Sequence, residues 1–258
     1  MKKLVLLALA AFLMSLLSSV WAADPVVVYL FNEGSGSVVH DSGPGAALDL
    51  TAADPGNISW IPGGGLSIND ETILISDGPA TKVIDACMAS NEITIEAWYK
   101  PANDTQGGPA RLVSVSLDGS FRNFSYTQDG AGHEVRLRTT TSGDNGTNQR
   151  IQAPNTIVTD RMMKGVYSRD TAGNAILYID GTEVASTTVG GDFSNWDPSY
   201  QIMLANEVAK AGDREWTGEL YYVAIYAEAL TPDELLPPTS VEPEYKVTTT
   251  WAGIKAAR

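Results

Sequence analysis

The sequence predicts an all-β protein with the layered architecture of a sandwich, and three observations indicate this fold class. Residues 175–185 (AILYIDGTEVA) contain two alternating apolar runs joined by Asp180 and Gly181. An Asp-Gly pair in this position is a strong hairpin signal, because both turn residues tolerate positive φ. Similar runs recur between Gly, Pro, Asn and Asp residues, at spacings of roughly 8–12 residues that are typical of sandwiches and barrels. No periodic run of ordinary helix length interrupts them.

The expected elements follow one another along the chain. Strands are expected at residues 26–31, 66–68, 72–75, 93–100, 111–117, 122–128, 135–140, 164–169, 175–179, 182–187, 202–205 and 218–226. Within residues 93–100, alternation directs Ile95 to the core and Glu96 to the opposite face. One or two helical turns are expected at residues 81–89. A short helix is expected at residues 231–236, where Thr can cap and Pro fits the first position.

The two ends of the chain differ in composition from its middle. Residues 1–22 begin with Met-Lys-Lys and continue as an apolar run, the pattern of a secretory signal peptide. The alternative, a membrane anchor, needs about 20 apolar residues, and this run stops at Ser18. We therefore expect cleavage before Ala23, export of the protein, one domain over residues 23–236, and a proline-punctuated tail over residues 237–258.

The chain is strongly acidic and contains a single cysteine. Its formal net charge is −14, from 17 Lys and Arg against 31 Asp and Glu. Such a surface repels phosphate backbones, so we expect no nucleic-acid partner. With Cys87 as its one cysteine, the chain cannot form an intramolecular disulfide or a multi-cysteine metal site. Stability must therefore come from burial, and the chain is long enough for one sizeable core.

Five fragments in order resemble a laminin G-like domain of the concanavalin A-like lectin and glucanase superfamily. The fragments are residues 28–36 (VYLFNEGSG), 39–43 (VHDSG), 93–98 (ITIEAW), 177–181 (LYIDG) and 218–226 (GELYYVAIY), the last followed by Ala229 and Leu230. The resemblance covers about residues 26–236 and implies a jelly-roll β-sandwich of two curved antiparallel sheets. It also implies a binding module for glycans or proteins, often with a structural calcium ion.

The resemblance places calcium ligands near the exit of the first strand. Calcium takes about six to eight oxygen ligands, many of them from carboxylates and tight turns. Asn32 stands at this exit, and Asp41 lies in an Asp-Ser-Gly turn where family members often place a ligand. The acidic residue usual in the last strand is replaced by Tyr221. The alternative is that Asn32 and Asp41 are turn formers that bond only to their own backbone.

Six residues are candidates for binding a ligand. They are Asn123, Gln128, Arg136, Arg138, Trp196 and Asn206. Arg136 and Arg138 alternate with Val135 and Leu137, so both project from one sheet face. Two guanidinium groups there can clamp a carboxylate-bearing or hydroxyl-rich ligand. The alternative is that they pair with Glu96 and other acids across strands.

The candidates on loops are Trp196 and Asn206. Trp196 belongs to a segment dense in turn formers, and Asn206 follows it. An aromatic ring can stack on a sugar, and an amide can read sugar hydroxyls. The alternative is that Trp196 plugs one end of the sandwich, because tryptophan is usually well buried.

Catalysis has less support in the sequence. Retaining glycosidases need two carboxyl groups about 5–5.5 Å apart, and the Glu-x-Asp-x-Glu spacing of laminarinase-type relatives is missing around Glu92 and Glu96. Neither His40 nor His133 has a nucleophile nearby in a recognisable motif. We therefore expect a secreted, non-catalytic binding module for an extracellular glycan or a surface protein. The alternatives are a polysaccharide-degrading glycosidase or lyase on the same fold, or a structural component of a cell-surface assembly.

Overall fold

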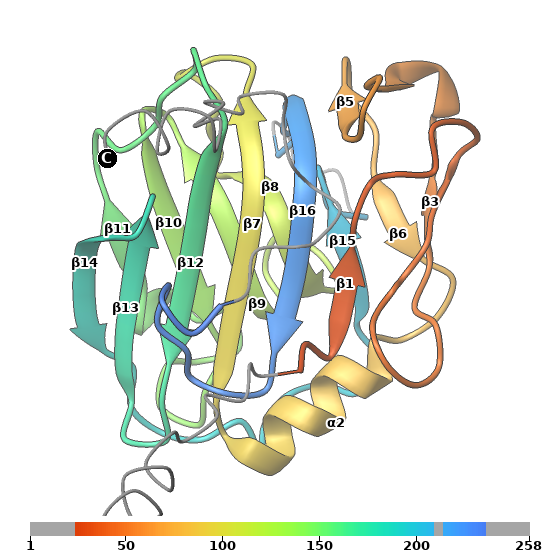
Figure 1. Ribbon diagram of the computed structural model, residues 1–258. Coiled ribbons are helices and arrows are strands. Elements are labelled where there is room, and N and C mark those ends of the chain that lie inside the picture. The colour runs from red at the N-terminus through yellow and green to blue at the C-terminus, as the bar shows by residue number, and fades with distance from the viewer. Residues whose placement is uncertain (1–23, 209–213, 236–258) are drawn as a thin grey trace, which may run out of the picture.

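Two antiparallel β-sheets pack face to face in the computed structural model, which describes residues 24–208 and 214–235 (Figure 1). Sheet A, in front in Figure 1, consists in order of β14 (Thr182–Thr188), β13 (Asn174–Ile179), β12 (Met163–Arg169), β7 (Ile93–Pro101), β16 (Gly218–Tyr226), β5 (Leu66–Ile68) and β4 (Ile58–Trp60), with β1 (Val27–Tyr29) paired to β16. Sheet B consists in order of β11 (Ile151–Ala153), β10 (Gly132–Leu137), β9 (Arg122–Asp129), β8 (Ala110–Ser116), β15 (Gln201–Leu204), β6 (Leu74–Ser76), β3 (Leu50–Ala52) and β2 (Val38–Val39). The arrangement confirms the predicted all-β, jelly-roll-like sandwich.

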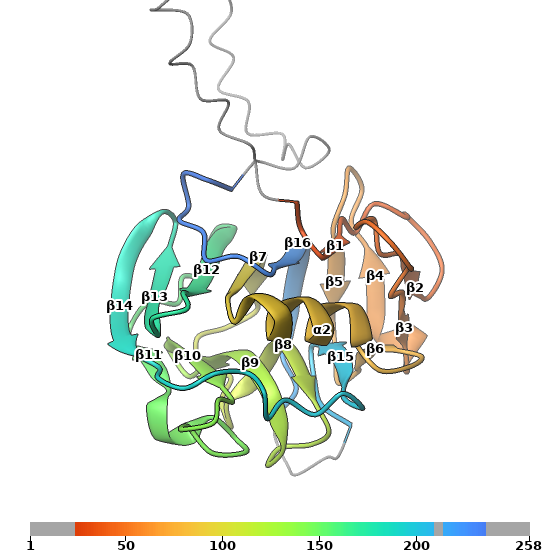
Figure 2. The same ribbon diagram turned by 90° about the horizontal axis from the view of Figure 1, so that it is seen from below.

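The helical content of the described residues is small. α2 (Thr81–Ser90) lies across one end of the sandwich between the two layers (Figure 2). It is longer than expected, and Val83, Ile84 and Cys87 on one of its sides are buried in the core. The other helical segments are two 3₁₀ turns, η2 (Pro55–Asn57) and η3 (Thr147–Gln149). No helix among the described residues combines the length and apolarity needed to cross a membrane.

The observed elements differ from the expected ones mainly in short segments. Three strands of three residues each were not expected: β3, β4 and β11. The short extended piece expected just before His40 is β2. The helix expected at residues 231–236 is wrong. Residues 232–234 form a turn, and both the amide and the hydroxyl of Thr231 donate to Glu234. Leu230 and Leu235 pack against the outside of sheet A there, so tertiary contacts replace the helical turn. Residues 1–22 and 237–258, expected to form the signal peptide and the tail, lie outside the described residues.

The hairpin that defined the fold class has the expected turn geometry. Asp180 and Gly181 have φ values of 51° and 78°, as a two-residue turn with two left-handed residues requires. β13 and β14 pair on either side of this turn.

The core lies between the facing sides of the two sheets. Ile95 and Tyr99 of β7 and Phe124 and Tyr126 of β9 are all fully buried there. The layers approach closely at Gly165 of β12, where an added Cβ would lie 1.9 Å from the hydroxyl oxygen of Tyr126. Glycine is therefore required at this position by the tyrosine of the opposite sheet.

A buried carboxylate joins the N-terminal strand, its loop and the helix. The carboxylate of Asp41 accepts hydrogen bonds from the backbone amides of Val28 (3.1 Å), Gly43 (2.8 Å) and Leu48 (3.0 Å). It also forms an ion pair with Lys82 of α2, and its side chain is fully buried. Because these donors come from the first strand, the loop that follows it and the helix, Asp41 holds this corner of the sandwich together.

Replacing Asp41 with alanine should lower the free energy of unfolding by about 3–5 kcal/mol, because it leaves three amides and a partly buried ammonium unpaired. The quantity to measure is the urea unfolding midpoint, with an unchanged slope. Asp233→Ala, at an exposed position, is the matched control and should change stability by no more than about 0.5 kcal/mol. Equal effects of the two variants would refute the role assigned to Asp41.

Candidate functional site

Polar side chains form rows across the outer face of sheet B. Residues paired in register across antiparallel strands share a face of the sheet. The rows consist of Gln152, Glu134, Thr127 and Arg111, of Arg136, Ser125, Ser114 and Met203, and of Arg122, Ser116 and Gln201. The opposite face carries apolar pairs such as Leu137 with Phe124 and Val135 with Tyr126. The sheet thus separates an apolar inner face from a polar outer face.

Two irregularities bring arginines to this outer face. The register between β8 and β9 shifts between Arg111 and Val113 and again between Val115 and Ser116. Strict alternation would place Arg111 and Ser114 on opposite faces, and the shift places both on the outer one. Arg122 reaches the same face through the second shift. Sequence reasoning missed Arg111 and Arg122 because simple alternation cannot detect a bulge.

Five arginines and two glutamates make up the charged part of the face, called here the arginine face. They are Arg111, Arg122, Arg136, Arg150, Arg214, Glu134 and Glu207. Glu207 Oε2 lies 3.0 Å from Arg111 Nε, and Glu207 Oε1 lies 3.7 Å from Arg214 Nε. Glu134 lies 2.5 Å from Arg136 Nε and 3.1 Å from Arg150 Nε. Each carboxylate therefore serves two guanidinium groups.

Arg122 lies among these groups, and in the described part of the chain no carboxylate forms an ion pair with it, although Glu207 is near enough to act on it electrostatically. The side chain of Arg122 donates to the backbone carbonyls of Asn145 (2.7 Å) and Gly119. Burial, together with the neighbouring Arg111 and Arg136, lowers the pKa of Arg122 to about 9. Its Nε, like Arg111 Nη2 and Ser125 Oγ on the same side of the sheet, is buried and has no hydrogen-bond partner among the described residues. This side of the sheet therefore contains buried polar atoms without internal partners.

Two of the predicted ligand residues, Arg136 and Arg138, lie on this side of sheet B and are partly exposed, at 17% and 14% of their side chains. Both pair with acids, Arg136 with Glu134 and Arg138 with Asp144 at 3.2 Å. The alternative expectation, that both arginines pair with acids, is confirmed. Glu96 is not among these acids, because it belongs to β7 of sheet A. Its carboxylate lies 2.9 Å from Lys164.

Asn123 and Trp196 position the loop that borders Arg138. Asn123 exchanges two hydrogen bonds of 2.9 Å with the backbone of Asp197. Trp196 donates from Nε1 to the carbonyl of Arg138 (2.7 Å) and stacks on Phe193 with ring centroids 4.6 Å apart. Only 3% of Trp196 is exposed, so it plugs the sandwich, as the structural alternative expected, and offers no open ring to a sugar.

Gln128 and Asn206 have different surroundings. Gln128 is fully buried on the inner side, where its amide donates to the carbonyls of Asn103 and Gly130 and accepts from Trp216 Nε1 at 3.0 Å. This corrects its placement on the ligand face, since its register partner is the inward-facing His133. Asn206 Oδ1 accepts the amide of Glu207 at 2.9 Å and so lies at the edge of the arginine face.

The residues expected to bind calcium do not form a calcium site. The carboxylate of Asp41 is already bonded to three amides and to Lys82. Asn32 is exposed, and Tyr221 donates to Glu219. Among the described residues, no group of three or more His, Cys, Asp or Glu side chains could hold a metal ion. The donor set here does not fit calcium, and Asp41 instead closes its own turn and binds an ammonium.

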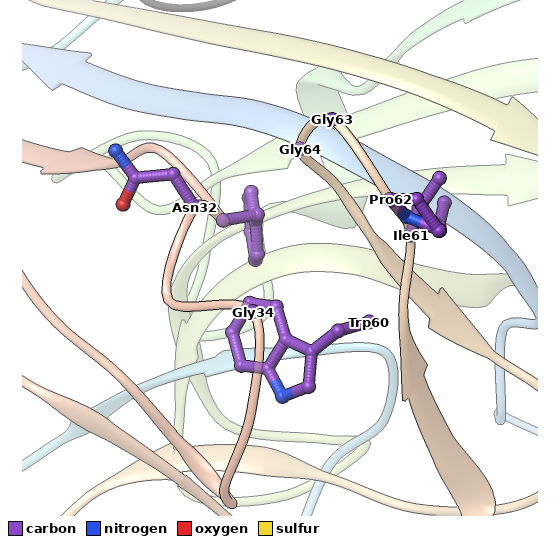
Figure 3. Close-up of a pocket in the computed structure, with 8 residues that line it drawn as sticks. Asn32, Gly34, Trp60, Ile61, Pro62, Gly63 and Gly64 are labelled. Atoms are coloured by element: carbon purple, nitrogen blue, oxygen red, sulfur yellow. The ribbon is translucent and has the colours of Figure 1, made fainter.

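Asn32 borders a hollow of about 330 Å³ at another corner of the molecule. The hollow is lined by Phe31, Asn32, Gly34, Trp60, Ile61, Pro62, Gly63 and Gly64. Figure 3 shows the Trp60 ring between the two loops and the Asn32 amide directed away from it. Trp60 Nε1 donates to the carbonyl of Gly36 at 2.9 Å. Side-chain hydrogen-bonding groups are thus sparse in this hollow compared with the arginine face.

His133 points between the sheets, away from the arginine face. Its Nδ1 lies 2.6 Å from the hydroxyl of Thr156, and its Nε2 contacts the hydroxyl of Tyr99. Burial lowers the pKa of His133 to about 3, so the ring is neutral in the folded protein at physiological pH.

Comparisons with known proteins bear on the fold. A laminin G-like family model, described as the concanavalin A-like lectin/glucanases superfamily, matches residues 76–236. A search of curated proteins found no match.

Among solved structures, a botulinum neurotoxin type C structure has a TM-score of 0.58 at 13% identity over 82% of this chain and 50% of its own. A Trypanosoma rangeli sialidase in complex with sialic acid has a TM-score of 0.55 at 15% identity over 81% of this chain. The botulinum neurotoxin type G receptor binding domain has a TM-score of 0.54 at 14% identity, over 82% of this chain and 50% of its own. This chain covers 31% of the sialidase and half of the toxin chains. At these identities the likeness concerns the fold alone.

The buried His133 should make stability depend on pH. Its folded pKa of about 3 lies below the ordinary 6.5, so between these values the unfolded chain binds a proton that the folded chain does not. Its contribution is therefore complete above pH 6.5 and falls by about 1.4 kcal/mol per pH unit on acidification below that.

The measurement is the difference in free energy of unfolding between the wild type and His133→Gln across this pH range, which should shrink as pH falls. The control is His40→Gln. The pKa of His40 is raised, mainly by its hydrogen bond to Asp49. The difference in free energy of unfolding between the wild type and His40→Gln should therefore grow as pH falls. A difference for His133→Gln that does not vary with pH would contradict the neutral, buried ring.

Proposed function

The chain belongs to the concanavalin A-like lectin/glucanases superfamily, and from this premise we propose that it is an exported, non-catalytic module that binds an extracellular glycan. The arginine face is the ligand surface of this proposal. Arg138 and the Asn123-anchored loop flank it.

One observation carries the proposal: guanidinium groups that are partly open to solvent stand on the outer face of sheet B. Arg136, Arg214 and Arg150 expose 17%, 20% and 39% of their side chains. Arg136 belongs to β10, which is paired with a strand on each side and buried on its inner side. Sugars are bound through many hydrogen bonds to hydroxyl groups, and donors held in place before binding lose little conformational entropy when the ligand arrives. Such a face suits a glycan.

Fold relatives give independent support for glycan binding. The type C toxin depends on interaction with two ganglioside molecules to enter cells, and the Trypanosoma rangeli sialidase is seen in complex with sialic acid. This chain shares their fold at low identity, so the analogy supports the ligand class and no individual contact.

The non-catalytic part of the proposal rests on how the ionisable groups are used. Both carboxylates of the arginine face, Glu134 and Glu207, are paired with guanidinium groups. The neutral His133 faces the interior and so cannot reach a ligand on the outer face. Export rests on the signal-like residues 1–22. A polysaccharide-degrading activity would appear as product released from acidic or neutral polysaccharides, and its detection would replace this proposal by the enzyme alternative.

A glycan array probed with the purified domain tests the binding function. The wild type should bind a defined set of glycans, and Arg136→Ala combined with Arg138→Ala should weaken that binding about tenfold or more, because charged hydrogen-bond donors are lost. Arg161→Ala removes an exposed arginine that pairs with Asp180 at 2.7 Å and should bind as the wild type does. An array without any bound glycan, or a double variant that binds normally, would refute the proposal.

A further inference from the structure

We infer that the arginine face binds the carboxylate group of an acidic sugar, such as a uronic or sialic acid residue of a glycan. This inference rests on the proposed glycan-binding function and names the ligand class for the same site.

The first argument is the local charge. The arginine face brings together five guanidinium groups and two carboxylates, an excess of three positive charges. The chain as a whole has a net charge of −14. Solubility does not require a positive face on an acidic protein, and a cluster of like charges repels itself. A ligand of opposite charge would relieve this repulsion.

The second argument is the burial of Arg122, which has no ion-pair partner among residues 24–208 and 214–235. Its side chain is fully buried, and only backbone carbonyls accept its hydrogen bonds. A buried charge without an opposite charge is costly, because the low-dielectric surroundings do not replace its hydration. The same surroundings strengthen the attraction of the cluster for an anion. A negative charge supplied by a ligand would give Arg122 the ion-pair partner that the described residues do not provide.

The third argument is the presence of accessible guanidinium groups above the buried ones. Arg136, Arg214 and Arg150 expose 17%, 20% and 39% of their side chains. A guanidinium presents parallel N–H groups that match the two oxygens of a carboxylate. In this arrangement Arg136 and Arg214 contact the sugar carboxylate. Arg111 and Arg122 act through these contacts, as positioning residues that keep the surface potential positive.

Isothermal titration with matched sugars separates charge from sugar shape. Two pairs of probes are used: trigalacturonate and its methyl ester, and sialyllactose and lactose. In each pair the second sugar lacks the negative charge of the first. At low salt, at least one acidic sugar should bind at least about tenfold more tightly than its uncharged counterpart. Added salt should weaken the binding of the acidic sugar and leave that of the uncharged sugar unchanged. The two pairs distinguish a uronic from a sialic acid. Galactose 6-sulfate serves as the anion control.

Substitutions on the arginine face should weaken or strengthen binding of the acidic sugar, depending on the charge that they remove. Arg136→Gln and Arg122→Gln should each weaken binding of the acid about tenfold and leave the uncharged sugar unchanged. Glu134→Gln frees Arg136 from its internal partner and should tighten binding of the acid alone. Arg161→Gln is the matched control. Thermal melting of every variant checks that it is folded. A variant that is merely unfolded would bind neither the acidic nor the uncharged sugar.

The outcomes separate this inference from the function on which it rests. Glycans that bind the array while acid and uncharged probes bind equally would overturn the carboxylate and leave glycan binding intact. A preference for the sulfated sugar over both carboxylates would also overturn it, as would weakening by Glu134→Gln in a folded protein. An empty array would overturn the function and the inference together.

Discussion

The contact between the inner faces of the two sheets is the constraint on which the rest of this molecule depends. This contact buries the apolar side of the long strands. At Gly165 the two sheets lie so close that an added Cβ would collide with the hydroxyl of Tyr126. Since successive side chains of a strand alternate between faces, fixing the inner rows fixes the outer rows as well. The arginine face is therefore held in place by packing that no ligand touches.

The bulges between β8 and β9 bring two arginines onto this regular surface. Each shift in register moves an arginine to the face that already holds serines, and small serine side chains leave room for long guanidinium groups to lie across the sheet. Among the described residues, two carboxylates pair with these arginines. The resulting face is cationic and incompletely paired, which agrees with the acidic ligand that we propose for it.

Two buried ionic groups of this protein, Asp41 and Arg122, differ in how fully they are paired. Asp41 is saturated by three amides and Lys82, so it holds the N-terminal segment and the helix and has nothing left for a metal. Arg122 is also buried, but among the described residues only backbone carbonyls accept its hydrogen bonds. The two groups therefore differ in the completeness of their partners and not in their burial.

The sequence by itself determined the alternation, the Asp-Gly hairpin and the long strands, because these depend on local periodicity and turn chemistry. It also placed Arg136 and Arg138 away from the core, since both follow the same period of two. Tertiary structure alone decided which residues lie beside them: Arg111 and Arg122 arrive through bulges, Arg214 and Glu207 through a distant segment, and Gln128 turns inward. These positions depend on register between strands far apart in the chain, and alternation within one strand carries no information about register.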